Sequence, residues 1–223
     1  MITTELVFVR HGQAQCNADG LVGGPRTCTG LTNLGYAQAE QAARRLATEH
    51  LKKPFDMVYA GPRIRLVQTG EIIAQTLQIP LHFDDRLDGP VHGDADGKPW
   101  DAVKTAANGG PHAHPDTPWA AGSDTWSGYL KRASKNLSQL IEENEGKRIV
   151  FAAHGETVIT AHTLLLDIPI GSPRASRTTT PQSLAGSTTA TAWARPAGCS
   201  IGTTTPSTSV SSHRNRPRDR HIG

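Results

Sequence analysis

The sequence predicts an α/β fold, a three-layer α/β/α sandwich in which helices cover both faces of a mostly parallel sheet. Two observations predict it. Short apolar, strand-like runs alternate with longer helix-like segments as far as residue 170, and this alternation is typical of parallel strands joined by helical crossovers. The chain also has 223 residues, which is enough for one such domain with a sizeable core.

In the first half of the domain, expected strands alternate with expected helices. Residues 6–9 form the first strand, and Thr32 is placed to cap the helix that follows it. Residues 57–60 form a short strand, and a helix follows over residues 62–77, where a proline suits the first turn. Residues 79–83 read as another strand.

The second half begins with a polar stretch, residues 84–122, that is rich in glycine, proline and histidine. We expect this stretch to form a lid over a binding site. A helix is expected near residues 123–144, then a strand at 149–153 and an apolar helix at 158–166. The folded domain is therefore expected to span residues 1–170.

Charge is distributed unevenly along the chain. The total is +3, but residues 171–223 contain seven arginines and one acid, so the first 170 residues carry −3. That balance is ordinary for a soluble enzyme and does not indicate a nucleic-acid partner. The three cysteines have no close spacing, which favours a reducing compartment. Because no apolar run reaches membrane-spanning length and no signal-peptide pattern precedes the first strand, we expect a cytoplasmic protein without a membrane partner.

Two histidines stand directly after expected strands. The first strand leads into RHG at residues 10–12, and the strand at 149–153 leads into HGE at residues 154–156. Ligands in open parallel sheets bind just beyond the carboxyl ends of strands, so His11 and His154 are expected to face one another across a site. This pairing suggests phosphoryl chemistry on histidine.

Four segments, in order, resemble the histidine phosphatase superfamily, also called phosphoglycerate mutase-like. They are RHG followed by Asn17, GLTNLGYAQA at residues 30–39, GPRIRLVQTGEIIA at 61–74 and AAHGE at 152–156. One tripeptide recurs by chance, but four motifs in their expected order and structural context are specific. The resemblance implies the phosphoglycerate mutase-like form of the sandwich and a phosphatase that needs no organic cofactor and no metal.

The resemblance also implies roles for individual residues. His11, as a neutral imidazole, attacks phosphorus and forms a phosphohistidine. The transferring phosphoryl group carries negative charge, which calls for fixed donors and close backbone approach around it. The expected phosphate cage consists of Arg10, Gly12, Asn17, Arg65, His154 and Gly155.

Two members of this cage have plain structural alternatives. Gln68 and Thr69 follow Arg65 as in the family's R-x-x-Q-T, but Arg65 could instead be an exposed helix residue with Arg63 as its competitor. Asn17 could only cap a turn.

The general acid, which would protonate the leaving oxygen, is not supplied by the expected motif. Family members usually carry a glutamate in L-x-E-x-x-x-G after the third strand, and this chain has Gly89 there. The nearest carboxylates are Asp88, one residue earlier, and Asp94 and Asp96. We expect Asp88 to be the acid, although any of the three could be a solvated surface carboxylate.

The main hypothesis is a phosphomonoesterase that hydrolyses a small phosphorylated metabolite through a phosphohistidine on His11. One alternative is a phosphoglycerate mutase-type phosphotransferase. Another is a non-catalytic phosphate-binding or regulatory domain, which Gly89 at the acid position keeps open. A metal site at His112 and His114 is a weaker alternative because no motif fixes its geometry.

Residues 171–223 have a composition that does not suit a folded core. They contain no Lys, Glu, Phe, Tyr or Met, and Thr, Ser, Arg, Pro, Ala and Gly dominate. One interpretation is a low-complexity extension. We favour a reading frame displaced by one base, with the switch between about residues 167 and 178, because the neighbouring frame of residues 178–186 permits the family-like ending DHASITRW. The printed residues lack an alternating apolar face, so we expect no closing strand after residue 170.

Overall fold

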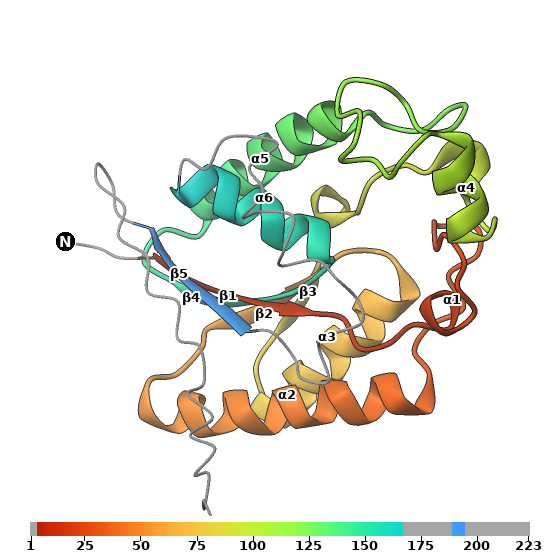
Figure 1. The fold of residues 1–223 in the computed structure, drawn as a ribbon. Coiled ribbons are helices and arrows are strands. Elements are labelled where there is room, and N and C mark those ends of the chain that lie inside the picture. The colour runs from red at the N-terminus through yellow and green to blue at the C-terminus, as the bar shows by residue number, and fades with distance from the viewer. Residues whose placement is uncertain (1–3, 167–188, 195–223) are drawn as a thin grey trace, which may run out of the picture.

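The structure is a computed structural model that describes residues 4–166 and the strand at residues 189–194. Figure 1 shows three layers, with α5 and α6 on one face of the sheet and α2 and α3 on the other, which confirms the predicted sandwich. The elements are β1 (Thr4–Arg10), α1 (Gln15–Ala18), α2 (Asn33–Lys52), β2 (Met57–Ala60), α3 (Ile64–Leu77), β3 (Leu81–Phe83), η1 (Asp85–Leu87), η2 (Gly93–Ala95), α4 (Trp100–Ala106), α5 (Trp126–Glu143), β4 (Arg148–Ala153), α6 (Gly155–Leu166) and β5 (Thr189–Ala194).

The sheet has the strand order β3-β2-β4-β1-β5. The first four of these strands are parallel, and β5 runs antiparallel to β1. β1 and β4 are neighbours in a register that pairs Arg10 with Ala153. The two strands that precede the motif histidines therefore end side by side.

Alternation of side chains along each strand builds two cores, one on each face of the sheet. On β1, Val7 and Val9 pack with residues of α2 and α3, such as Leu46 and Ile73. Leu6 and Phe8 of the same strand point the other way and pack with residues of α5 and α6. Strands buried on both faces read as continuous apolar runs, which explains why the sequence of β1 shows no polar alternation.

Local capping sets where the helices begin. Thr32 caps α2 as predicted, because its hydroxyl accepts a hydrogen bond from the backbone N–H of Gly35. α5 begins at Trp126, later than predicted, because Thr125 accepts a hydrogen bond from the N–H of Gly128 in the same way. The polar stretch at residues 84–122 contains a helix, α4, that its composition did not suggest.

The expectation that no strand forms after residue 170 is wrong for β5. Thr189–Ala194 pairs antiparallel with β1, with Thr4 opposite Ala194 and Val9 opposite Thr189. The ladder uses backbone N–H and C=O groups, which any residue but proline supplies, so an apolar face is not required for pairing. The displaced reading frame stays a prediction, and most of the segment that it concerns lies outside the described residues.

In the part of the chain that the structure describes, no helix combines the length and apolar character needed to cross a membrane.

Candidate active site

The two motif histidines meet at the carboxyl ends of β1 and β4. The backbone N–H of His11 donates a hydrogen bond of 3.0 Å to the carbonyl oxygen of Ala153, which continues the β1–β4 pairing by one residue. The imidazole rings of His11 and His154 lie edge to face, with their centroids 5.4 Å apart. This arrangement confirms the expected placement of two strand-end histidines across one site.

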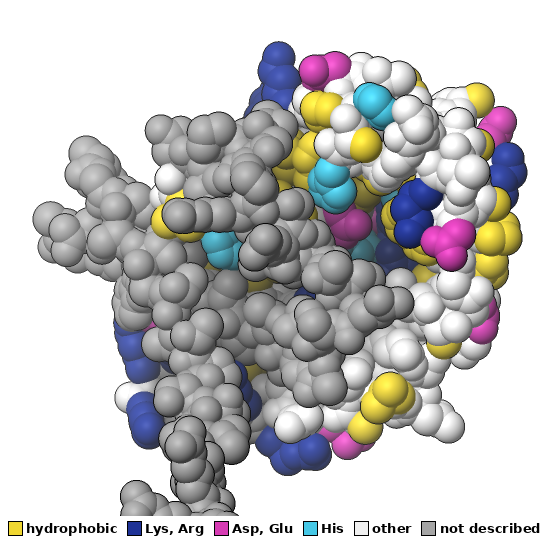
Figure 2. Space-filling view, viewed as in Figure 1, with side chains coloured by type: hydrophobic (Ala, Val, Ile, Leu, Met, Phe, Trp, Pro, Cys, Tyr) yellow, Lys and Arg dark blue, Asp and Glu magenta, His cyan; other side chains and the backbone are white. Residues whose placement is uncertain are grey.

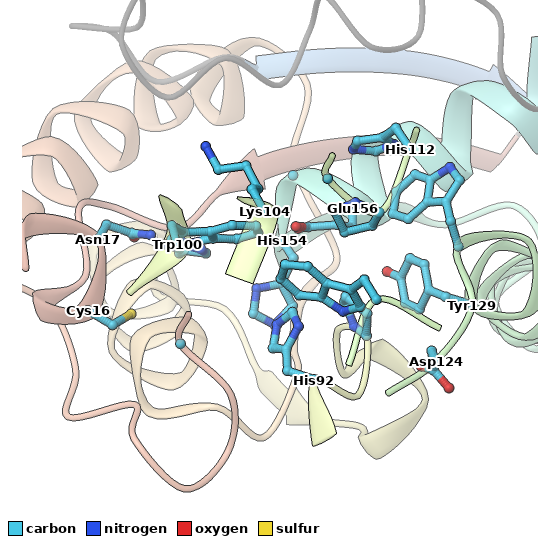
Figure 3. A pocket seen from close by; sticks show the side chains of 18 of the residues that line it. Cys16, Asn17, His92, Trp100, Lys104, His112, Asp124, Tyr129, His154 and Glu156 are labelled. Carbon is cyan, nitrogen blue, oxygen red and sulfur yellow. The ribbon is translucent and has the colours of Figure 1, made fainter. Parts of the chain in front are cut away.

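A cavity of about 580 Å³ opens above these histidines. Histidine, acidic and basic side chains gather around this hollow in Figure 2, and Figure 3 shows the side chains that line it. Its inner end includes Arg10, His11, Arg65 and His154. Its outer wall is aromatic and ionisable, with His92, Trp100, Asp101, Lys104, His112, Trp119, Asp124, Trp126 and Tyr129, and Glu156 also lines the cavity.

The hydrogen bonds of His11 fix its tautomer. Nδ1 lies 2.7 Å from the carbonyl oxygen of Gly12, which can only accept, so Nδ1 carries the proton. Nε2 accepts a hydrogen bond of 3.2 Å from Nε of Arg65 and therefore holds the lone pair. Burial, together with the nearby Arg65, His154 and Arg10, lowers the pKa of His11 well below its usual value. His11 is thus a neutral imidazole that lines the cavity and holds its lone pair on Nε2.

Arg65 is a buried cation at the floor of the cavity, not an exposed helix residue. It lies in the first turn of α3 and is 6% exposed. Its Nη2 donates a hydrogen bond of 3.0 Å to the carbonyl oxygen of Gly23 and lies 3.5 Å from Nδ1 of His154. Its Nη1 is buried and has no partner within the described chain. An unpaired buried guanidinium nitrogen beside His11 is a suitable donor to a bound anion.

His154 is neutral and buried, with 1% exposure. Its burial and the charges of Arg65 and Arg63 lower its pKa well below the usual value. Because Arg65 can only donate, Nδ1 of His154 accepts, and the proton lies on Nε2. His154 can therefore act as a hydrogen-bond donor to an anion without being protonated.

The other expected cage residues are placed as follows. Arg10 and Asn17 line the cavity, and Oδ1 of Asn17 also accepts a hydrogen bond of 3.2 Å from the backbone N–H of Ala14. Gly155 lines the cavity as the first residue of α6, where backbone N–H groups lack partners within the helix. The structure thus brings these three residues together with His11 and Arg65.

Gly12 has a different reason to be glycine from the one expected. A Cβ atom there would lie 2.1 Å from the carbonyl oxygen of Gly35 in α2, which no real contact allows. Gly12 is also absent from the residues that line the cavity. The glycine allows close packing of the RHG turn on α2, and the pattern of residues in the sequence did not reveal that contact.

Asp88 is held by Arg63 outside the cavity lining. Its Oδ1 lies 2.6 Å from Nε of Arg63, accepts the backbone N–H of Gly89 at 2.8 Å and lies 3.9 Å from Nε2 of His154. Arg63 is 4% exposed and also donates to the carbonyl oxygens of Gly23 and Pro90. Arg63 therefore ties two loops together, and Asp88 neutralises it.

The two other carboxylates considered for the acid also lie outside the cavity lining. Asp96 accepts hydrogen bonds from the backbone N–H groups of Gly24 and Arg26 and from the hydroxyl of Thr27. Hydrogen bonds from these groups hold the pKa of Asp96 below its usual value. Asp96 thus fixes the loop that carries Gly23. Asp94 is exposed.

The sequence analysis did not single out several ionisable residues of the cavity wall, among them His92 and Glu156. His92 is buried, and burial lowers its pKa to about 4. Glu156 stands two residues after His154 within the AAHGE motif, and that proximity was a signal that it reaches the same site. Among the described residues no group of three or more side chains could hold a metal ion, and His112 packs against Trp126 with ring centroids 4.2 Å apart.

Comparison with known proteins shows which family has this sequence pattern. The family model "Histidine phosphatase superfamily (branch 1)" matches residues 6–188. A putative phosphoserine phosphatase 2 from Hydrogenobacter thermophilus is 39% identical over 93 residues, 42% of this chain and 43% of that protein. A 2,3-bisphosphoglycerate-dependent phosphoglycerate mutase from Methylobacterium is 30% identical over 173 residues, 73% of this chain and 80% of that protein.

Among solved structures, YhfR from Bacillus stearothermophilus has the same fold, with a TM-score of 0.71 and 20% identity over 90% of this chain and 96% of that one. The match to the putative phosphoserine phosphatase 2 spans less than half of that protein's length. The family match, in contrast, covers most of this chain and contains His11, Arg65 and His154. The chain belongs to the histidine phosphatase superfamily, branch 1.

Proposed function

We propose that this protein is a phosphomonoesterase that hydrolyses a small phosphorylated metabolite through a phosphohistidine on Nε2 of His11. The main support for this proposal is the arrangement of His11 and Arg65. His11 is a neutral imidazole whose lone-pair nitrogen, Nε2, stands beside a buried, incompletely paired guanidinium, that of Arg65. A nucleophile and an anion-stabilising donor thus share one end of the cavity.

In the first step, Nε2 of His11 attacks phosphorus in line with the leaving oxygen, and the P–O bond breaks as the P–N bond forms. Arg10, Arg65 and the Nε2–H of His154 donate hydrogen bonds to the phosphoryl oxygens, whose negative charge develops in the transition state. The hydrogen bond from Nδ1 to the carbonyl oxygen of Gly12 stabilises the imidazole as it becomes positive.

In the second step, water attacks phosphorus from the side that the leaving group vacated. The P–N bond breaks, inorganic phosphate leaves, and His11 returns to its neutral form. The same donors serve both steps because both transition states place charge on the same three oxygens.

The cavity supports a small substrate. Its volume of about 580 Å³ suits a metabolite, and its outer wall of tryptophan, histidine and charged side chains can contact the part of the substrate beyond the phosphate. The relatives named phosphoserine phosphatase and phosphoglycerate mutase carry names of small phosphorylated acids, which supports the same class. A protein-sized or nucleic-acid substrate is not part of the proposal.

The phosphoglycerate mutase among the relatives keeps phosphotransfer as a second candidate function. A mutase returns the phosphoryl group to an acceptor alcohol, whereas a phosphatase delivers it to water. Phosphate release measured with and without added 3-phosphoglycerate separates these two fates.

The test of function is a screen of hydrolysis over phosphorylated amino acids, sugars, nucleotides and glycerates, with release of phosphate as the readout. We expect the parent protein to hydrolyse at least one of them and His11→Ala to hydrolyse none, because no other group replaces the attacking imidazole. His82→Ala is the matched control, since His82 is exposed on β3 and lies outside the cavity lining. Substantial turnover by His11→Ala, or none by the parent, would contradict the proposal and favour a phosphate-binding domain.

A further inference from the structure

A phosphatase that acts on alkyl phosphates needs a proton donor, because an alkoxide is a poor leaving group. In this chain the position at which the family usually has a glutamate cannot supply that proton donor. It is occupied by Gly89, and a Cβ atom at this position would lie 2.9 Å from Cδ2 of His154. The ring of His154 fills the space into which a side chain would extend. Asp88, one residue earlier, is paired with Arg63 and does not line the cavity, which leaves the carboxylates that do line it as candidates.

Among the residues that the structure describes, three carboxylates line the cavity: Asp101, Asp124 and Glu156. Asp124 is already engaged, since its Oδ2 lies 2.6 Å from Nη2 of Arg132 and accepts the backbone N–H of Val91 at 2.9 Å. These two contacts hold the Asp124 carboxylate against Arg132 and the backbone of Val91. Asp101 pairs with Lys104 at 3.0 Å, and its side chain is 96% exposed to solvent.

Glu156 differs from both. It is partly buried, and its carboxylate has no hydrogen bond or ion pair with any other residue in the described chain. It is the second residue of α6, so it follows His154 and Gly155 directly at the inner end of the cavity. Figure 3 shows the Glu156 side chain projecting into the cavity between Trp100 and Tyr129.

The groups that face Glu156 support this position within the cavity. Its negative charge acts to raise the pKa values of His92, His112 and Tyr129, which are all cavity-lining residues. His92 and His112 come from the polar stretch at residues 84–122, and Tyr129 comes from α5. Glu156 therefore faces the wall that would contact the leaving group and stands two residues after His154 in the chain.

We propose that Glu156 is the catalytic residue that protonates the leaving oxygen, an inference that rests on the proposed phosphatase function. As His11 forms the P–N bond and the P–O bond breaks, the carboxyl proton of Glu156 passes to the leaving oxygen, and the product departs as an alcohol. For this step the carboxyl group of Glu156 must carry a proton when the substrate binds.

The same carboxylate then serves the second step. The Glu156 carboxylate removes a proton from the water that attacks the phosphohistidine, and the P–N bond breaks to release inorganic phosphate. Glu156 thereby regains its proton, so that the cycle is balanced without any further acid or base.

The decisive experiment compares two substrates in Glu156→Gln. Para-nitrophenyl phosphate has a leaving group that needs no proton, whereas an alkyl phosphate found to be a substrate of the parent does. The value of kcat/KM reports P–O cleavage in both cases, because release of the leaving group commits the first step. We expect kcat/KM to fall by about 10²–10⁴-fold for the alkyl phosphate and by less than about 10-fold for the nitrophenyl ester.

Two further variants and one further readout sharpen the comparison. Glu156→Asp keeps a carboxyl group, so it should regain part of the lost alkyl phosphatase activity. Glu71→Gln removes the charge of an exposed glutamate of α3 outside the cavity lining. It should leave kcat/KM unchanged for both substrates. With the nitrophenyl ester, Glu156→Gln should accumulate phosphohistidine, because the base that activates water is missing.

Each outcome decides a different claim. An equal loss for both substrates in Glu156→Gln would overturn the proton-donor role and indicate a role in binding or folding. A leaving-group effect confined to Asp88→Asn would assign the acid to Asp88 instead. If the parent hydrolyses neither ester, the proposed function fails, and the inference fails with it.

Discussion

Replacement of Arg65 by methionine tests the buried cation of the site. Methionine fills much of the same volume but carries no charge and no donor. Arg65 supplies a hydrogen bond of 3.2 Å to Nε2 of His11 and a buried, unpaired Nη1 beside the cavity. Removal of one such preorganised donor costs about 2.7–4 kcal/mol of transition-state stabilisation, which is about 10²–10³-fold in kcat/KM.

The structure also predicts that this variant folds. Arg65→Met removes the hydrogen bond from Nη2 to the carbonyl oxygen of Gly23, but Nη1 of Arg63 still donates to that oxygen at 3.1 Å. The hydrogen bonds to Nε2 of His11 and to Gly23 are both lost at about 1 kcal/mol each, and removal of a buried charge offsets part of this cost. Urea unfolding should therefore show a decrease in the free energy of unfolding of about 2 kcal/mol or less.

The pH profile of the same variant provides a second readout. His11 must be neutral to attack, so activity is lost as the pH falls through its pKa. After burial, the charge of Arg65 is the next cause that lowers this pKa. In Arg65→Met the pKa of His11 should rise, and the acidic limb of the kcat/KM profile should move to higher pH.

Steady-state kinetics over a range of pH measures both effects. Arg44→Met is the matched control, because the side chain of Arg44 is 66% exposed in an ion pair with Glu40 on α2. A variant of Arg65 with the activity and acidic limb of the parent would refute the role of this cation in catalysis.

Three other perturbations test separate parts of the account. Gly12→Ala should lower the free energy of unfolding by about 1–3 kcal/mol in urea, because its Cβ would overlap the carbonyl oxygen of Gly35; an unchanged stability would refute the packing explanation. Asp88→Asn should lower stability by about 1.5–3 kcal/mol, since the buried Arg63 loses its charged partner, while leaving-group dependence stays that of the parent. A frame-corrected segment 171–223 should raise the melting temperature and phosphatase activity above those of the printed chain, and equal values for both would favour the printed sequence.

The sequence could predict the sandwich and the meeting of His11 with His154 because both follow from short-range patterns. Apolar runs define the strands, and parallel strands bring their carboxyl ends to one edge of the sheet. The order of the strands then makes β1 and β4 neighbours.

The structural partners of Asp88 and Gly12 could not be predicted in the same way. Asp88 was the carboxylate nearest to the family position in sequence, but its contact with Arg63 joins residues 25 positions apart. The contact of Gly12 with Gly35 likewise depends on how α2 packs against the RHG turn. Neither contact leaves a periodic signal in the chain.

The strand β5 illustrates a different limit. Thr189–Ala194 (TATAWA) has alanine at every second position, but these six residues stand in a segment whose overall composition does not suit a core, and their backbone pairs with β1. The composition of residues 171–223 therefore predicted no strand, although the backbone of β5 pairs with that of β1.

Direct detection of the covalent intermediate is the strongest test of the central claim. The protein is mixed rapidly with a substrate from the screen, quenched under alkaline conditions that preserve phosphohistidine, digested and analysed by mass spectrometry. The account predicts one phosphoryl group on His11, formed and lost at rates that match turnover and absent from His11→Ala. Turnover by the parent without phosphohistidine at His11, or with the label on another residue, would contradict it.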